Sequence, residues 1–137
     1  MANKKFFVGM SAITLALVLL LTGCGTVDGG RHDANSPPDQ DCSLMFKGVS
    51  PSPFVKIPHV TAFDGAPVNW KGEMGSFAPF KGKSFTVKIP AGEHTLSGVA
   101  TGATGDSPGT MTVTYTFTAG HKYTVKIKDG SFEIVDK

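Results

Sequence analysis

The feature that most constrains this chain is an alternation with a period of two residues in its C-terminal part. Between 111 and 118, apolar residues at odd positions alternate with threonines at even positions. Successive side chains of a β-strand point to opposite faces, so this pattern is typical of a half-buried strand. It recurs over 84–89, 122–128 and 131–135. Residues 42–137 contain no helical periodicity longer than two turns, which predicts an all-β fold.

Turn residues separate these segments at three places: Pro90-Ala91-Gly92, Ala119-Gly120 and Asp129-Gly130. An Asp-Gly pair between two alternating runs is a strong hairpin signal. Other strand patterns lie at 43–47, 53–60, 66–70 and 93–100. Pro53 and Pro58 favour a sheet edge for the second of these, because proline cannot donate to a ladder. About seven or eight short strands at this spacing predict an antiparallel β-sandwich, immunoglobulin-like in its general plan.

The alternation also predicts which side chains share the buried face, since residues two apart in a strand point the same way. We expect the inward-pointing positions to form one core, and they are Phe85, Val87, Ile89, Leu96, Val113, Tyr115, Phe117, Tyr123, Val125, Ile127 and Ile134.

The N-terminus follows a different pattern. Lys4 and Lys5 precede an apolar run from 6 to 21, and small residues follow it. These are the three parts of a secretory signal. The run is shorter than the ~20 residues of a spanning helix. We therefore expect residues 1–23 to be a helical, cleaved signal peptide; an uncleaved membrane anchor is the alternative.

The end of this segment, Leu21-Thr22-Gly23-Cys24, resembles the lipobox of bacterial lipoproteins. The resemblance implies that Cys24 receives a diacylglycerol, that signal peptidase II cuts before it, and that fatty acids such as palmitate anchor the chain to a membrane of the cell envelope. In enterobacteria-like cells, Asp after the lipidated Cys usually retains a lipoprotein in the inner membrane. Gly25 lacks that signal, so the resemblance implies the outer membrane if the host is diderm.

The charge of the chain agrees with a lipid anchor rather than an electrostatic one. Lys and Arg number 13 and Asp and Glu number 11, and loss of Lys4 and Lys5 leaves 11 of each. A neutral domain has no overall basic character for nucleic acid, so no nucleic-acid partner is expected. Buried acyl chains contribute ~0.8 kcal/mol per methylene to membrane binding.

Residues 24–41 are rich in Gly, Asp and Pro, and Val27 is their single large aliphatic residue. Such a composition predicts a flexible tether. Its typical end-to-end distance of ~20–25 Å would hold the domain away from the membrane. The folded domain is then expected to span 42–137.

Two cysteines are present, Cys24 and Cys42. If Cys24 carries lipid, Cys42 has no disulfide partner within the chain. Cys42 opens the apolar run 42–46, which favours a buried thiol. A Cys24–Cys42 disulfide is the alternative, and it requires an unlipidated Cys24.

Three turn motifs resemble the PEGA-like group of small exported β-sandwiches: Pro90-Ala91-Gly92-Glu93-His94-Thr95-Leu96, Ala119-Gly120-His121-Lys122-Tyr123 and Asp64-Gly65-Ala66-Pro67-Val68. The resemblance covers about residues 60–128. It implies a non-enzymatic module of the cell envelope with no shared catalytic residues.

The sequence does not predict an enzyme, a metal or a cofactor. Gly82-Lys83-Ser84 ends like a phosphate-binding loop, but that loop requires a glycine where Phe77 stands. The histidines lack the i,i+2 or i,i+4 spacing of a local metal pair. His94 and His121 each follow a turn and are expected to be separate surface residues. The serines lack the Gly-x-Ser-x-Gly elbow of hydrolases.

Two loops remain as candidates. Residues 71–82 place Phe77 and Phe80 among glycines directly after Trp70. They either cover the core or form a recognition surface. Residues 101–109 are small and polar, typical of a solvated loop. We expect a non-enzymatic lipoprotein with an envelope protein partner; the alternative is a small-ligand or carbohydrate-binding lipoprotein that uses Trp70, Phe77 and Phe80.

Overall fold

The computed structural model describes residues 25–49, 54–75 and 82–137. The signal peptide expected at 1–23 and the lipidation expected at Cys24 lie outside the described residues. Among the described residues, no helix has the length and apolar character needed to cross a bilayer. The elements are β1 (Thr26–Arg31), the 3-10 turn η1 (Pro38–Gln40), β2 (Asp41–Phe46), β3 (Lys56–Phe63), β4 (Ala66–Lys71), β5 (Ser84–Pro90), β6 (Gly92–Gly102), β7 (Gly105–Asp106), β8 (Met111–Phe117), β9 (Lys122–Lys128) and β10 (Ser131–Asp136).

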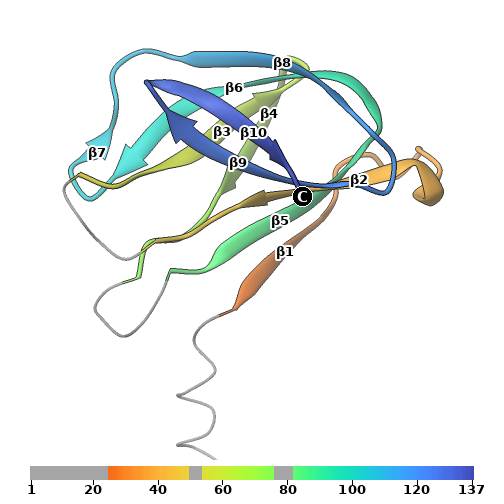
Figure 1. Cartoon of the computed structure of the whole chain (residues 1–137), viewed down its shortest axis with the longest axis horizontal. Coiled ribbons are helices and arrows are strands. Elements are labelled where there is room, and N and C mark those ends of the chain that lie inside the picture. The colour runs from red at the N-terminus through yellow and green to blue at the C-terminus, as the bar shows by residue number, and fades with distance from the viewer. Residues whose placement is uncertain (1–24, 50–53, 76–81) are drawn as a thin grey trace, which may run out of the picture.

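These strands form two sheets, which confirms the predicted all-β class. The first sheet has the order β1-β5-β2-β9-β10. The second has the order β4-β3-β6-β7, and β8 also pairs with β6. Figure 1 shows β1, β5 and β2 toward the bottom of the view and β6 and β8 toward the top.

The first sheet is mixed, whereas the sequence led us to expect antiparallel pairing throughout. β1 pairs with β5 in parallel, and β2 pairs with β9 in parallel. Parallel neighbours need a long crossover between them. The intervening strands supply it: β2, β3 and β4 lie between β1 and β5 in the chain, and β3 to β8 lie between β2 and β9. Alternation within a strand carries no information on the direction of its neighbour.

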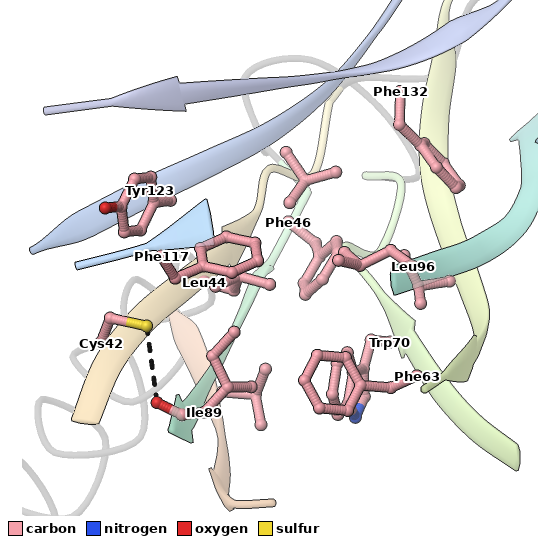
Figure 2. Close-up of a cluster of buried hydrophobic side chains, with 13 residues drawn as sticks. Cys42, Leu44, Phe46, Phe63, Trp70, Ile89, Leu96, Phe117, Tyr123 and Phe132 are labelled. Atoms are coloured by element: carbon pink, nitrogen blue, oxygen red, sulfur yellow. Dashed lines mark hydrogen bonds between the residues drawn. The ribbon is translucent and has the colours of Figure 1, made fainter. Parts of the chain in front are cut away.

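The core lies between the two sheets, and its composition confirms the predicted inward face. The side chains of Val87, Ile89, Leu96, Phe117, Tyr123 and Val125 are buried in it. The other predicted positions are partly buried and pack against the same cluster: Phe85, Val113, Tyr115, Ile127 and Ile134. Figure 2 shows Leu44, Phe46 and Tyr123 of the first sheet facing Phe63, Leu96 and Phe117 of the second.

The predicted turns occur where the sequence places them. Asp64-Gly65 and Asp129-Gly130 link β3 to β4 and β9 to β10, and all four residues have positive φ. Consecutive positive φ values are the mark of type I′ hairpin turns. The turns at Gly92 and Gly120 instead carry the chain from one sheet to the other.

β3 is an interior strand, although its prolines favoured an edge. It pairs with β6 along its whole length, but its pairing with β4 begins only at His59. Pro58 therefore lies where β3 has a single neighbour, opposite Ala100 of β6. A missing N–H is tolerated there because no second ladder needs it. Pro53 lies outside the described residues.

Residues 25–41 differ from the flexible tether expected of them. Thr26 to Asp28 of β1 pair with the start of β5, and the His32 amide donates to the Lys88 carbonyl at 2.9 Å. The domain therefore starts near residue 26 rather than 42.

Polar contacts hold this segment, which is why its composition was misleading. Arg31 donates from Nε and Nη2 to the two carboxylate oxygens of Asp41, at 2.7 and 3.2 Å. The Asp41 side chain is only 6% exposed, so this two-point pair is protected from solvent. Gly29 lies close against the ring of Phe85, and a Cβ at this position would overlap the ring unless the ring moved.

Candidate functional site

His94 and Asp64 form a polar pair that two turns bring together. His94 lies at the start of β6, on the same face as Leu96. Its Nδ1 is 2.6 Å from Asp64 Oδ2, and its Nε2 is 2.9 Å from the Pro90 carbonyl oxygen. A carbonyl and an ionised carboxylate can only accept hydrogen bonds. With Asp64 ionised, both ring nitrogens therefore face hydrogen-bond acceptors.

The Asp64 carboxylate is held in its ionised form. Burial is the largest single effect and raises its pKa. Hydrogen bonds from the Thr95 amide and from His94, together with the charges of His94 and His32, outweigh it, so the pKa of Asp64 is lowered. Its Oδ1 accepts from Thr95 N at 2.8 Å. The pair thus joins the β3–β4 hairpin to β6 and serves the fold.

Trp70 lies in the core instead of presenting its ring to a ligand. It is 6% exposed, and its ring centroid is 5.1 Å from Phe63 and 6.1 Å from Phe46. The His32 ring closes over it edge-on at 5.1 Å. Figure 2 shows Trp70 beside Phe63 among the buried side chains. The hypothesis that Trp70 contacts a sugar or small ligand needs an accessible ring face, which burial removes. Phe77 and Phe80 lie outside the described residues.

Cys42 is buried, as its apolar neighbours predicted. It is 2% exposed, and its thiol donates to the Ile89 carbonyl at 3.5 Å, the dashed line in Figure 2. Burial raises the pKa of this thiol to about 11. At neutral pH it is therefore protonated, and a protonated thiol is a poor nucleophile.

The remaining histidines also have partners of their own. His121 Nδ1 is 2.8 Å from Asp136 Oδ2, and His59 Nε2 is 2.7 Å from Asn69 Oδ1. Within residues 25–49, 54–75 and 82–137, no group of three His, Cys, Asp or Glu side chains could hold a metal ion.

The described surface is hollowed in two regions. On the outer face of the first sheet, a hollow of about 380 Å³ is lined by Ser43, Met45, Thr86, Lys122, Tyr123 and Lys137. Two more lie side by side where β3 begins, with Ile57 in both walls. One, of about 360 Å³, includes Lys71 and Met74. The other, of about 180 Å³, includes Lys47 and Lys56.

Charge is divided unevenly between the two ends of the fold. We define the β1 end as the end where β1 and β5 begin and β2, β4 and β9 finish. Its described charged residues are six lysines and five carboxylates: Lys47, Lys56, Lys71, Lys83, Lys126 and Lys128 against Asp28, Glu73, Asp106, Asp129 and Glu133. The opposite end carries Arg31, Lys88, Lys122 and Lys137 against Asp33, Asp39, Asp41, Asp64, Glu93 and Asp136. A near-neutral composition therefore hides one excess lysine at the β1 end and two excess carboxylates at the opposite end, which the sequence order alone did not reveal.

Comparison with protein-family models, with curated proteins and with solved structures gave no match for this chain.

Proposed function

We propose that this chain is a lipid-anchored module of the cell envelope that acts by binding another envelope component. The anchor is Cys24, and the all-β domain that follows is the interacting part. In a diderm host the module resides in the outer membrane, because Gly25 lacks the retention signal described above.

The observation that carries this proposal is the position of β1 relative to the lipobox-like residues. The signal-like segment and Cys24 are followed at once by Thr26, the first residue of a paired strand. An export signal and a lipobox-like Cys ahead of a folded two-sheet domain form an organisation that fits a lipoprotein. Two or more acyl chains suffice for stable anchoring.

A PEGA-like plan for the domain is part of the proposal. Two of the three motifs that suggested it meet directly at the end opposite β1, and the third is held by contacts to the preceding residues. Asp64 of one motif binds His94 of the second. Tyr123 of the third accepts a hydrogen bond from the Thr118 amide at 2.8 Å and contacts the Phe117 ring. These contacts supply a structural reason for residues that the resemblance had singled out.

Binding is favoured over catalysis because the groups with chemical potential are used by the fold. His94 and Asp64 hold two turns together, His121 is paired with Asp136, and the Cys42 thiol is buried and protonated. The alternative of a carbohydrate-binding lipoprotein loses Trp70, its main aromatic group, to the core.

Replacement of Cys24 tests the anchor. In cells grown with a labelled fatty acid, the natural protein should carry label, and Cys24→Ala should carry none and accumulate as a larger precursor. Cys42→Ala is the matched control, since it removes the other thiol and should leave labelling intact. Label retained by Cys24→Ala would overturn the proposal.

Cross-linking in intact cells tests the partner. A reversible cross-linker followed by purification of the full-length protein should recover an envelope protein in defined proportion. The same partner should be lost from Cys24→Ala cells if its capture depends on anchoring. A protein that yields only itself at every cross-linker concentration would contradict an interaction module.

A further inference from the structure

The chain between Cys24 and the folded domain is too short to be a spacer. β1 begins at Thr26, and two residues span at most about 7 Å even when fully extended. If Cys24 carries acyl chains, the β1 end of the fold is therefore held at the level of the lipid headgroups.

The charge of the β1 end is complementary to an anionic membrane. Its described residues have one more lysine than carboxylates, whereas the opposite end has two more carboxylates than basic side chains. A bilayer with anionic lipids attracts lysines within about a Debye length of its surface and repels carboxylates. The two ends thus favour the same orientation, with β1 toward the membrane.

Exposed apolar side chains point to the same end. Among the described residues, the large exposed hydrophobic side chains are Val27, 40% exposed, and Phe54, 91% exposed. Val27 lies at the start of β1, and Phe54 precedes the start of β3. Aromatic rings are favoured at the membrane–water interface. The hollows beside Ile57 add lysines next to apolar walls at this end, with Met74 in one wall and Val49 in the other.

We infer that the β1 end of the fold is a docking surface for an anionic phospholipid bilayer. This inference rests on the proposed anchor at Cys24 and gives that anchor a defined orientation. The domain lies against the lipid headgroups through Lys47, Lys71, Lys83 and Phe54, and the end that carries His94 and Asp136 faces away from the membrane.

The test measures which lysines the bilayer protects. The full-length lipidated protein is reconstituted into vesicles of phosphatidylglycerol and phosphatidylcholine, and into detergent micelles. All samples are treated with an amine-acylating reagent, and each lysine is quantified by mass spectrometry. In the anionic vesicles, Lys47, Lys71 and Lys83 should react at least about fivefold more slowly than in micelles, because docking covers them. Lys122 and Lys137 at the opposite end should react equally in both.

Two triple charge-reversal variants isolate the electrostatic contribution to docking. Lys56 donates to the Gly105 carbonyl and Lys128 pairs with Glu133, so both are left unchanged as reporters. The variant Lys47→Glu/Lys71→Glu/Lys83→Glu should remove the protection of these reporters in anionic vesicles. The control Lys88→Glu/Lys122→Glu/Lys137→Glu has the same change in net charge and should retain it. High salt should weaken the protection in the natural protein.

The outcomes separate this inference from the anchor itself. Acylation of the Cys24 peptide is measured in the same samples by mass. Acylated protein whose lysines react equally in vesicles and micelles would overturn the docking surface and leave the anchor standing. Equal loss of protection in both charge-reversal variants would also overturn it, since net charge rather than the β1 end would then be responsible. An unmodified Cys24 peptide would overturn the anchor, and with it the orientation.

Discussion

Replacement of Gly29 by alanine tests whether residues 25–41 belong to the folded domain. A Cβ at residue 29 would overlap the ring of Phe85, which packs against the core. Overpacking of this kind costs typically about 1–3 kcal/mol. Loss of glycine freedom in the unfolded chain offsets only about 0.4–1 kcal/mol. The overlap should win, so we expect Gly29→Ala to destabilise the domain by about 1.3 kcal/mol, the difference between the midpoints of these two ranges.

The matched control is Gly25→Ala, since a Cβ on Gly25 meets no atom within 4 Å. Thermal unfolding of the chain from residue 25 to 137 gives the comparison. Gly29→Ala should lower Tm by roughly 3–15 °C, and Gly25→Ala should leave it nearly unchanged. A flexible tether would instead make the two variants equivalent.

Hydrogen exchange detects a second response to Gly29→Ala, in which β1 detaches from β5 instead of straining the core. The His32 amide, bound to the Lys88 carbonyl, should exchange at least about tenfold more slowly than an unstructured amide in the natural protein. Gly29→Ala should speed this exchange, and Gly25→Ala should not. Random-coil exchange of His32 in the natural protein, with equal Tm values for both variants, would refute the assignment of β1 to the fold.

Three further predictions concern the core and the buried groups. In a urea titration, Phe117→Ala should lower the free energy of unfolding by ~3–5 kcal/mol, because Phe117 is 2% exposed and packs on Tyr123. The variant Thr116→Ala, at the exposed neighbouring position, should lower it far less. Equal losses would show that the assignment of the buried face is wrong. The pKa of Asp64 is lowered in the folded state, so its stabilising contribution is present above its unfolded pKa and is lost as the pH falls below about 4. Asp64→Asn should therefore lose less stability than the natural protein between about pH 5 and pH 2, and parallel stability profiles would contradict this. Cys42, with its pKa raised to about 11, should react with iodoacetamide at pH 8 at least about 100-fold more slowly in the folded protein than in urea; similar rates would mean that the thiol is accessible.

The strands and the core could be predicted because one physical rule governs them. Period-two alternation fixes a buried face, and every predicted core position from Phe85 to Ile134 is in the core or packs against it. Asp129-Gly130 likewise encodes its turn locally, through two residues that tolerate positive φ.

β1 could not be predicted because its stabilising contacts are distant and polar. Arg31 donates to Asp41, the His32 amide donates to the Lys88 carbonyl, and the His32 ring contacts the rings of Phe63 and Trp70. In a sequence, a glycine that packs closely against a ring cannot be distinguished from a glycine in a linker, so Gly29 contributed to the prediction of a flexible tether. These contacts join residues that lie apart in the sequence, so they can be identified only in the folded structure.

The charge difference between the two ends of the fold could not be predicted for a related reason. Lys47, Lys71 and Lys83 lie far apart in the sequence, and only the strand order gathers them at the β1 end. Trp70 shows the converse: an aromatic residue beside a glycine-rich loop resembles a binding group, but its strand position turns it into the core.

The mass of the N-terminal peptide tests the central claim most directly. Protein extracted from membranes of cells that express the full chain would be digested and its first peptide measured by mass spectrometry. The account predicts a peptide that begins at Cys24 and carries a diacylglycerol on the thiol, directly ahead of Gly25 and β1. A peptide that begins at Met1, or one that contains an unmodified Cys24 thiol, would contradict it.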